Sequence, residues 1–343
     1  MKKIKIVILY ILKYIGLFWL VGKYNKRKLR ILCYHGISFQ DEHHFLPVLF
    51  MSETLFRHRM ALLSQLNYPV ISLDFAVEAL KNNSLPDNAV VITFDDGWEG
   101  IFSKAVPILQ EYNFPASIYI TSYYAQKRTP VLNVLLQYIL WKSKAPSIDL
   151  GALEETGLSG LMALNSREQW QNASKKILFH LEKKYSTEDR QDFIKRICKK
   201  LNVDWKRLQT NRMFRLAPPK MIKEYSQISG IEMELHTHRH VFPDSSYEEC
   251  LAEIQENQAF LFKWTGKKSW HFCYPSGWYD KKQITWLQNI GVKSATTVQP
   301  ALNECGKNLW ELDRFLDGEN ISDIEFKAEL CGISDFLRNI ARR

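Results

Sequence analysis

The strongest constraint on the fold is an alternation of short β-branched or aromatic runs with amphipathic helical stretches. The runs predict strands at residues 30–34, 69–72, 89–94, 116–121, 231–235, 270–274, 292–298 and 309–315. Helices are predicted between them, at residues 52–65, 73–82, 101–112, 219–229, 247–265 and 281–290. This alternation is typical of a parallel α/β sheet or barrel, and the apolar character of several strands indicates that both their faces are covered.

The alternation is interrupted between about residues 125 and 216. This stretch has no convincing strand but shows helical patterns at residues 131–141, 167–184 and 187–200. Because no Gly/Pro-rich linker flanks it, we interpret it as a helical insertion in one domain spanning residues 30–343, rather than as a second domain. The insertion is expected either to cover the functional site or to dock a partner.

A basic and apolar tail precedes the predicted domain. Of the 46 Lys and Arg residues, nine lie in the first 30 positions, and no acidic residue occurs before Asp41. The rest of the chain therefore has as many cations as its 37 acidic residues, and the net charge of +9 belongs to the tail. Charge confined to an apolar segment indicates anionic lipid as its partner and argues against nucleic acid.

The apolar part of the tail, residues 6–21, covers about 24 Å as a helix, less than the ~30 Å hydrocarbon core of a bilayer. We therefore expect residues 1–29 to form a membrane-associating helix in the interface, while a short signal-anchor and a buried helix of the domain remain open alternatives. The cysteines lack paired spacing, which favours a reducing compartment. The expected location is a bacterial-type inner membrane, at its cytoplasmic face, although lysines on both flanks leave the orientation open.

Two adjacent carboxylates, Asp95 and Asp96, follow the apolar strand at residues 89–94 and precede Gly97. In α/β folds, ligands bind at the carboxyl ends of the strands. Neighbouring residues at a strand end point in different directions, so one carboxylate is free to bind a metal while the other lies near the metal-bound water. An acidic turn after a strand is common, so this motif alone is not specific.

A histidine cluster, His236, His238 and His240, follows the strand at residues 231–235. The i, i+4 spacing places His236 and His240 on one face of a helical turn, where two imidazoles share one metal, and His238 then points elsewhere. With one carboxylate from the first motif they form an open three-ligand set. Such a set is typical of catalytic sites that activate a water.

These two motifs resemble the first two signatures of the polysaccharide deacetylase family, the NodB-homology carbohydrate esterases. The resemblance implies a distorted (β/α) barrel of about seven parallel strands. It also implies a divalent metal, with Zn the expected ion, whose ligands are Asp96, His236 and His240. Asp95 is then the general base that deprotonates the water.

The run at residues 272–277 resembles the third motif of that family but departs from it. Cys273 and Ser276 take the places where many members carry an Arg and a Tyr. A main-chain N–H near Ser276 is still expected to donate to the oxyanion, because a backbone donor does not depend on the side chain. Arg314 is expected to orient Asp95 in place of the missing Arg. The residues assigned to substrate binding are Tyr34, Tyr274, Pro275, Ser276, Gly277 and Arg314.

The general acid requires a separate argument, because many relatives take it from a late histidine and this chain has none after His271. The first predicted strand ends in Tyr34 and His35. This resembles the branch of the family that deacetylates poly-N-acetylglucosamine, in which the histidine motif comes first. The resemblance implies that His35 is the general acid, and a histidine that caps the strand through backbone hydrogen bonds is the alternative.

Together these features predict a metal-dependent hydrolase that removes N-acetyl groups from an N-acetylated amino sugar in a polysaccharide or lipid-linked glycan. Its expected partners are that glycan and a membrane surface, and no nucleic acid. Two alternatives stay open: a catalytically inactive glycan-binding module on the same fold, and a metal-dependent hydrolase of another amide or ester.

Overall fold

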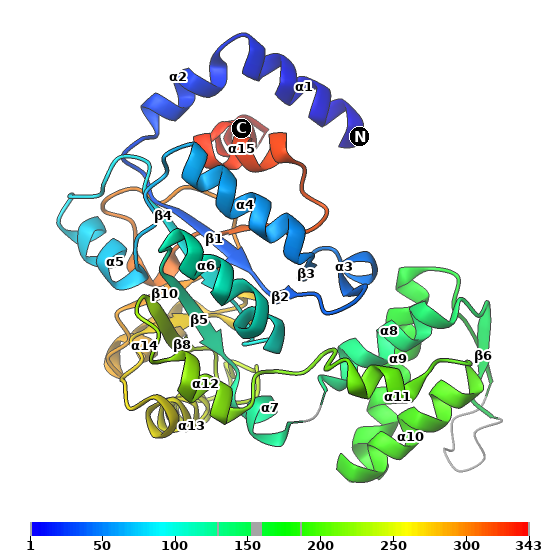
Figure 1. Ribbon diagram of the computed structural model, residues 1–343. Coiled ribbons are helices and arrows are strands. Elements are labelled where there is room, and N and C mark those ends of the chain that lie inside the picture. Colours follow the sequence, from blue (N-terminus) through cyan, green and yellow to red (C-terminus); the bar gives the residue numbers. More distant parts are fainter. Residues whose placement is uncertain (1, 129, 152–159, 186, 342–343) are drawn as a thin grey trace.

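The computed structural model describes residues 2–128, 130–151, 160–185 and 187–341, and a seven-stranded sheet lies at its centre (Figure 1). The strand order is β10-β9-β8-β5-β4-β1-β11, and all registered neighbours in this sheet are parallel. The strands are β1 (Arg30–Tyr34), β4 (Val90–Phe94), β5 (Ala116–Ile120), β8 (Ile231–Leu235), β9 (His271–Cys273), β10 (Ser294–Thr296) and β11 (Phe315–Leu316). The three neighbouring strands β1, β4 and β5 are buried along their whole length, as their apolar runs predict.

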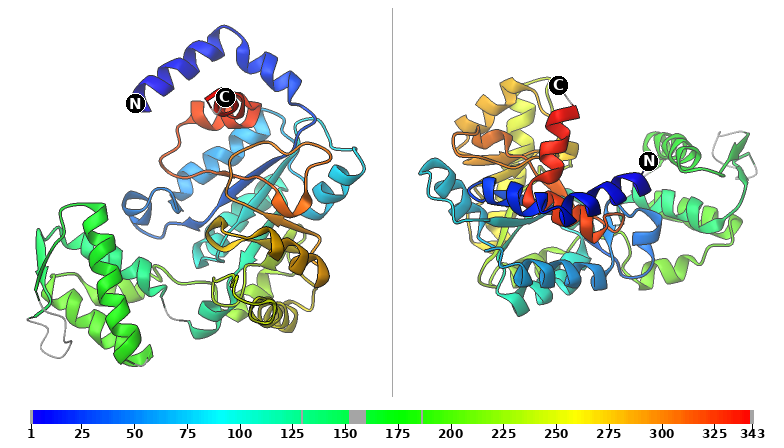
Figure 2. Two further views of the ribbon diagram at one scale, coloured as in Figure 1. Left: turned by 180° about the vertical axis from the view of Figure 1, so that it is seen from behind. Right: turned by 90° about the horizontal axis from the view of Figure 1, so that it is seen from above.

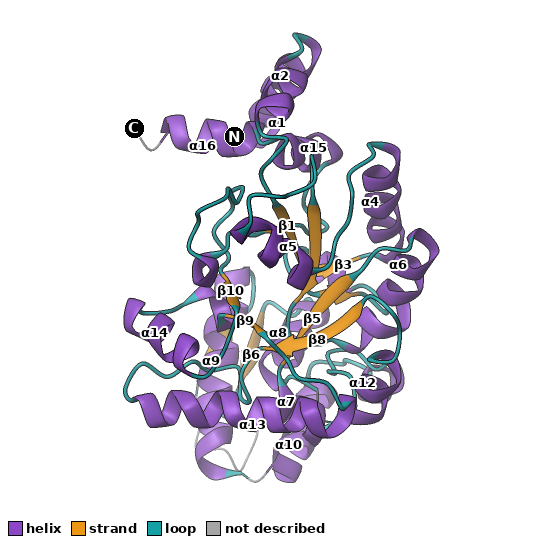
Figure 3. Cartoon of the chain, turned by 90° about the vertical axis from the view of Figure 1, so that its left-hand side faces the viewer, coloured by secondary structure: helices purple, strands orange, loops and turns teal. Residues whose placement is uncertain are grey.

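The sheet curls into an open barrel whose two edges are β10 and β11. A single parallel bridge from Thr296 to Leu312 lies near the gap between these edges. Helices surround the strands (Figure 3). The predicted distorted (β/α) barrel of about seven parallel strands is therefore confirmed.

Each of the six predicted barrel helices has a counterpart in the structure. The counterparts are α4 (Glu53–Gln65), α5 (Leu73–Lys81), α6 (Val106–Tyr112), α12 (Pro219–Tyr225), α13 (Tyr247–Thr265) and α14 (Lys281–Asn289). The hydroxyls of Ser52 and Ser72 accept hydrogen bonds from the first turns of α4 and α5, which fixes where these helices begin. Short elements follow β1: β2 (Gly36–Ile37), α3 (Glu42–Phe45) and β3 (Phe50–Met51).

Three local predictions differ from the structure. Residues 69–72 form no strand, because only Val70 bridges to Val90 and Ser72 caps the next helix. The predicted helix at residues 101–112 divides into a π-helical turn, Ile101–Ala105, followed by α6. The run at residues 309–315 divides into a 3-10 turn, Leu309–Glu311, followed by β11.

The segment at about 125–216, of which residues 129, 152–159 and 186 lie outside the described part, is mostly helical and stands apart from the sheet (Figures 1 and 2). Its helices are α8 (Leu132–Ser143), α9 (Arg167–Lys184), α10 (Thr187–Lys200) and α11 (Trp205–Thr210), and α7 (Ser122–Lys127) leads into it. The expectation of no strand here is wrong, since β6 (Ser147–Asp149) and β7 (Leu161–Ala163) form an antiparallel ribbon. The Tyr138 hydroxyl donates to Asp41 at 2.6 Å and joins α8 to the loop after β2.

The N-terminal tail forms two helices rather than the single predicted one. The first, α1 (Lys2–Tyr14), and the second, α2 (Leu17–Tyr24), meet at 79° where Gly16 adopts a φ of 83°. They pack on two C-terminal helices that the sequence patterns did not predict, α15 (Asp323–Cys331) and α16 (Ile333–Ala341). No single helix among the described residues is long and apolar enough to cross a membrane, although the bent pair α1 and α2 meets that test by length and composition.

Candidate functional site

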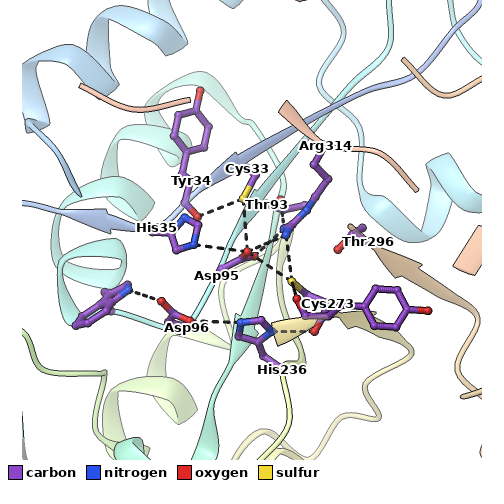
Figure 4. Close-up of polar contacts among 12 residues, drawn as sticks. Cys33, Tyr34, His35, Thr93, Asp95, Asp96, His236, Cys273, Thr296 and Arg314 are labelled. Carbon is purple, nitrogen blue, oxygen red and sulfur yellow. Dashed lines mark hydrogen bonds and ion pairs between the residues drawn. The ribbon is translucent and has the colours of Figure 1, made fainter. Parts of the chain in front are cut away.

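The candidate site lies at the carboxyl ends of neighbouring strands, at the mouth of the barrel (Figure 4). His35 follows β1, the pair Asp95 and Asp96 follows β4, and His236 follows β8. Because the strands are parallel, residues from three distant parts of the sequence meet at one edge of the sheet.

Three of these side chains converge on one point. The Asp96 Oδ1 atom lies 3.3 Å from His236 Nε2 and 3.4 Å from His240 Nε2. Their ligand atoms all lie within 4.8 Å of one another, close enough to bind one ion. The structure thus brings together the three residues that the sequence assigns to a metal.

Two further contacts orient these side chains as metal ligands. His236 Nδ1 is 2.9 Å from the Cys273 carbonyl, and an N–H donated there leaves the Nε2 lone pair directed at the site. The Trp98 indole N–H donates to Asp96 Oδ2 at 2.8 Å and fixes the plane of the carboxylate. Trp98 is not among the residues that the sequence motifs predict, although its position two residues after Asp96 in the same turn is a usable signal.

The backbone at the site adopts unusual conformations. Asp96, Thr237 and His240 all have positive φ, at 68°, 61° and 59°. Such strain is concentrated at functional sites, where the surrounding structure maintains it. The prediction of a helical turn between His236 and His240 is wrong, because this segment forms an irregular turn that brings the two imidazoles together by a different route.

Gly97 completes the first motif for a steric reason. Its φ is 85°, and a Cβ atom there would lie 2.7 Å from the Ile120 side chain on β5. The turn after Asp96 therefore requires glycine.

Asp95 forms a buried ion pair with Arg314. The two guanidinium nitrogens of Arg314 donate to Asp95 Oδ1 at 2.7 Å and to Oδ2 at 2.8 Å. Burial alone would raise the pKa of Asp95, but the charge and hydrogen bonds of Arg314 hold that pKa well below its ordinary value. Asp95 is therefore ionised at neutral pH. The thiols of Cys33 and Cys273 flank it, each 3.5 Å from Oδ2.

Asp96 is ionised for related reasons. Burial opposes its negative charge, but the hydrogen bond from His236 and the charge of His240 keep the pKa of Asp96 below its ordinary value. An anionic carboxylate beside two imidazoles is a suitable donor set for a divalent transition metal.

His35 lies on the other side of Asp95 from Arg314. Its Nε2 atom is 3.8 Å from Asp95 Oδ2, and its side chain is 13% exposed. Its Nδ1 atom is buried and has no hydrogen-bond partner among the described residues. His35 is thus held at the mouth, beside the carboxylate, with one ring nitrogen unused by the protein.

His238 has a structural role. Its Nδ1 atom lies 2.9 Å from the Ser122 hydroxyl, and its Nε2 atom lies 3.1 Å from Glu256. The Ser122 hydroxyl is fully buried and also accepts from Asn257 at 3.0 Å, so no substrate reaches it. The expectation that His238 points away from the metal ligands agrees with these contacts.

Two assignments to substrate binding are wrong because the side chains lie in the core. The Tyr34 ring is 1% exposed and packs edge-on against Phe56, directed away from Asp95 (Figure 4). The Tyr274 ring is fully buried and stacks on Tyr279, with its hydroxyl bonded to the Trp310 carbonyl. Both residues precede the turn at a strand end, where side chains still alternate between the two faces of the sheet.

The assignment of Arg314 to substrate binding is also corrected. Its guanidinium is fully buried and is bonded to Asp95, to Thr93 and to the Thr297 carbonyl. Arg314 therefore orients Asp95, as the sequence also predicts, and its side chain cannot contact a glycan.

The third-motif turn presents only part of its residues to the surface. Pro275 is buried, Ser276 is exposed with a φ of 56°, and Gly277 is half-buried. A Cβ atom at Gly277 would lie 2.3 Å from Val298, so this position requires glycine. Ser276 and Gly277 are the residues of this motif that remain available to a substrate.

An open set of one carboxylate and two imidazoles, beside a buried and ionised second carboxylate, is typical of hydrolase sites that use a divalent metal to activate a water. Comparison with known sequences identifies the family. The profile of the polysaccharide deacetylase family matches residues 82–145 and 172–295, which is more than half of the chain. The chain therefore belongs to the polysaccharide deacetylase family, whose deacetylases are metal-dependent.

A curated relative shares a short segment with the chain. It is the poly-beta-1,6-N-acetyl-D-glucosamine N-deacetylase of Escherichia coli strain K12, 38% identical over 61 residues. That segment makes up 18% of this chain and 9% of the relative.

Solved structures confirm the fold along most of the chain. A Streptococcus pyogenes deacetylase, PplD, in complex with acetate gives a TM-score of 0.58 at 18% identity, covering 88% of this chain and 98% of that one. IcaB from Ammonifex degensii gives a TM-score of 0.56 at 15% identity, covering 89% and 97%. At these identities the likeness concerns the fold.

Proposed function

We propose that this protein is a metal-dependent hydrolase that removes N-acetyl groups from an N-acetylated amino sugar in a polysaccharide or lipid-linked glycan. The observation that carries the proposal is the open ligand set of Asp96, His236 and His240 beside the ionised Asp95. The short match to an N-acetylglucosamine deacetylase supports an amino-sugar amide as the substrate.

We propose the following roles for these residues in the reaction. Asp96, His236 and His240 would hold a divalent metal, with Zn the expected ion, which would act as a Lewis acid toward the acetamide carbonyl and the attacking water. Asp95 accepts the proton of that water as its oxygen attacks the carbonyl carbon. A main-chain N–H near Ser276 donates to the developing oxyanion. His35 protonates the departing amine, so the C–N bond breaks to give acetate and a free amino sugar.

The pair of Asp95 and Arg314 favours an enzyme over an inactive glycan-binding module. A module that only binds glycan does not require an ionised carboxylate beside an open set of metal ligands. Asp95 is ionised at neutral pH and lies where it can accept a proton, which supports an enzyme.

We also propose that the protein works at a membrane surface, through its N-terminal helices. The exposed aliphatic residues and lysines of α1 and α2 support this proposal. The expected location is the cytoplasmic face of a bacterial-type inner membrane. A glycan that is made or carried at that surface would then lie within reach of the barrel.

The test is acetate release by Zn-loaded protein from N-acetylglucosamine oligomers and from lipid-linked N-acetylated glycans. We expect Asp95→Asn to lower the rate by roughly 10²- to 10⁴-fold and His35→Ala by about 10²-fold, because each removes a proton-transfer group. Asp192→Asn, at an exposed carboxylate on α10, is the matched control and should retain full activity.

Wild-type protein whose metal has been removed with a chelator provides a second test, in which the amino-acid sequence is unchanged. It should release no acetate until Zn is restored. Circular dichroism of each variant separates loss of chemistry from loss of fold. If the Zn-loaded wild type binds these glycans but releases no acetate from any of them, the inactive module becomes the better description.

A further inference from the structure

A cavity of about 480 Å³ lies beneath the bend between α1 and α2. Four lysines line it, Lys13, Lys23 and Lys26 from the N-terminal segment and Lys327 from α15. The aromatic rings of Trp19 and Tyr68 also line it, and no acidic residue is among the described residues that do so. We call this cavity the elbow cavity.

The positive charge of the elbow cavity is largely uncompensated. Lys26 pairs with Asp87 at 2.8 Å, at the edge of the cavity. Lys23 lies 5.3 Å from the centre of the Trp19 ring. Lys13, Lys23 and Lys327 form no ion pair with any described residue of the chain. Cations gathered around one cavity repel one another, so the cavity favours an anion at its centre.

The surface around the elbow cavity is apolar. Ile15 and Trp19 are each 70% exposed, and Leu20 is 57% exposed. Other exposed apolar residues lie on α1 and α16 and do not line the elbow cavity. The exposed apolar residues there are Ile4, Val7, Ile8, Ile11, Phe336 and Ile340. A soluble polyanion has no use for such side chains, whereas a bilayer surface accepts both the aliphatic groups and the lysines.

Both ends of the chain contribute to this surface. The four helices α1, α2, α15 and α16 lie together on one side of the molecule, and the helical insertion lies on the opposite side (Figures 1 and 2). Leu9 of α1 is only 1% exposed because it packs against Ile324 and Ala328 of α15. The surface is thus part of the folded domain.

We propose that the elbow cavity is a binding site for the phosphate headgroup of an anionic membrane lipid. Lys13, Lys23 and Lys327 hold the phosphate, while Ile15, Trp19 and Leu20 enter the acyl layer beside it. The site rests on the proposed membrane association and is independent of the deacetylation reaction. It orients the barrel on the bilayer through four packed helices, with the insertion directed away.

The experiment is co-flotation of the full-length protein with two kinds of vesicle. One is pure phosphatidylcholine, and the other contains phosphatidylglycerol at roughly a third of the lipid. We expect the wild type to bind the anionic vesicles far more tightly, and raised salt to reduce that binding. The triple variant Lys13→Gln, Lys23→Gln and Lys327→Gln should bind them about 10- to 100-fold more weakly.

A matched control removes the same charge elsewhere. Lys175→Gln, Lys176→Gln and Lys200→Gln lie at exposed positions of α9 and α10, on the insertion. This control should bind anionic vesicles like the wild type. Lys13→Glu alone provides a second variant should the triple one fold poorly, and it should weaken binding at least as much as Lys13→Gln.

The outcomes separate the headgroup site from the membrane association on which it rests. If the triple variant of Lys13, Lys23 and Lys327 and the control bind anionic vesicles equally, the proposed headgroup site is wrong, although the protein still associates with membranes. If the wild type binds neither kind of vesicle, the membrane association is wrong as well. Acetate release from soluble oligomers should be the same for all these variants, so a failure of the deacetylase proposal is recorded independently.

Discussion

Asp95 pairs with an arginine that comes from a different part of the chain than the family resemblance predicts. The resemblance places an arginine where this chain has Cys273, yet the carboxylate is paired all the same. The guanidinium of Arg314 arrives from the loop before β11 and lies 3.1 Å from the Cys273 sulfur. A small thiol leaves room for that guanidinium, so the same ion pair forms from a different position in the chain.

This pairing predicts a large loss of stability for Arg314→Met. The variant leaves the Asp95 carboxylate buried without its partner, which should lower the free energy of unfolding by about 3–5 kcal/mol. Urea denaturation measures it. Adding Asp95→Asn to Arg314→Met removes the stranded charge and should restore part of the loss. If the double variant were less stable than either single one, the ion pair would not be the source of the effect.

The strand β8 carries a buried carboxylate that the proposed chemistry does not use. Glu234 accepts hydrogen bonds from the main-chain N–H groups of Trp270 and His271, both at 2.8 Å, and so ties β8 to the start of β9. Burial raises the pKa of Glu234 to about 7, even though the charge of His271 and these hydrogen bonds act in the opposite direction.

The raised pKa predicts how stability varies with pH. An unfolded glutamate has a pKa of about 4.3, so the folded state holds an extra proton between that pH and about 7. The free energy of unfolding should therefore fall as pH rises through this window. Glu234→Gln removes the titration and should be more stable than the wild type by up to about 3 kcal/mol at pH 8, with little difference near pH 4.

Denaturation at a series of pH values measures this difference. Glu248→Gln, at an exposed position on α13, is the matched control and should follow the wild type throughout. A Glu234→Gln variant with the wild-type pH dependence would mean that Glu234 stays ionised in the fold.

Sequence patterns predict best the helices and strands whose buried residues recur at a regular spacing. Helix α13 and strand β8 match their predicted bounds because apolar periodicity and caps are local signals. The metal ligands are equally local, since each follows a strand end. The sequence wrongly places the side chains of Tyr34 and Tyr274 at the site. The face toward which the last residue of a strand points depends on how the sheet curls, and local patterns do not encode this.

Other elements depend on tertiary contacts. The bend at Gly16 divides an apolar segment that reads as one helix, and α16 is too short to be predicted from its pattern alone. Helix α15 does carry local signals, a capping box of Ser322 and Glu325 and a C-cap at Gly332, which the apolar patterns did not include. Arg314 reaches Asp95 by the closure of the barrel, which no motif spacing encodes.

At the scale of the whole molecule, the N-terminal helices bury some apolar residues against the C-terminal helices and expose others at the surface. The neighbours Leu9 and Ile8 on α1 are 1% and 45% exposed. Cys331, 7% exposed, lies in the same cluster as Leu9, and its Cβ atom is 3.5 Å from the position of a Cβ at Gly22 on α2. Cys331 also lines the elbow cavity, but with only 7% of its surface exposed it should react slowly until these helices separate from α15.

This arrangement predicts opposite behaviour for two adjacent substitutions. Leu9→Ala should lower the free energy for separating α1 from α15 by about 3 kcal/mol, which raises the labelling rate of Cys331 roughly 100-fold. Ile8→Ala should leave the labelling rate nearly unchanged and weaken vesicle binding instead, because Ile8 is 45% exposed and is not part of the buried cluster around Leu9. Peptide mapping after timed alkylation distinguishes Cys331 from the half-buried Cys305. Equal labelling of both variants would mean that α1 is a detached anchor, whereas the predicted contrast makes it a structural helix of the barrel.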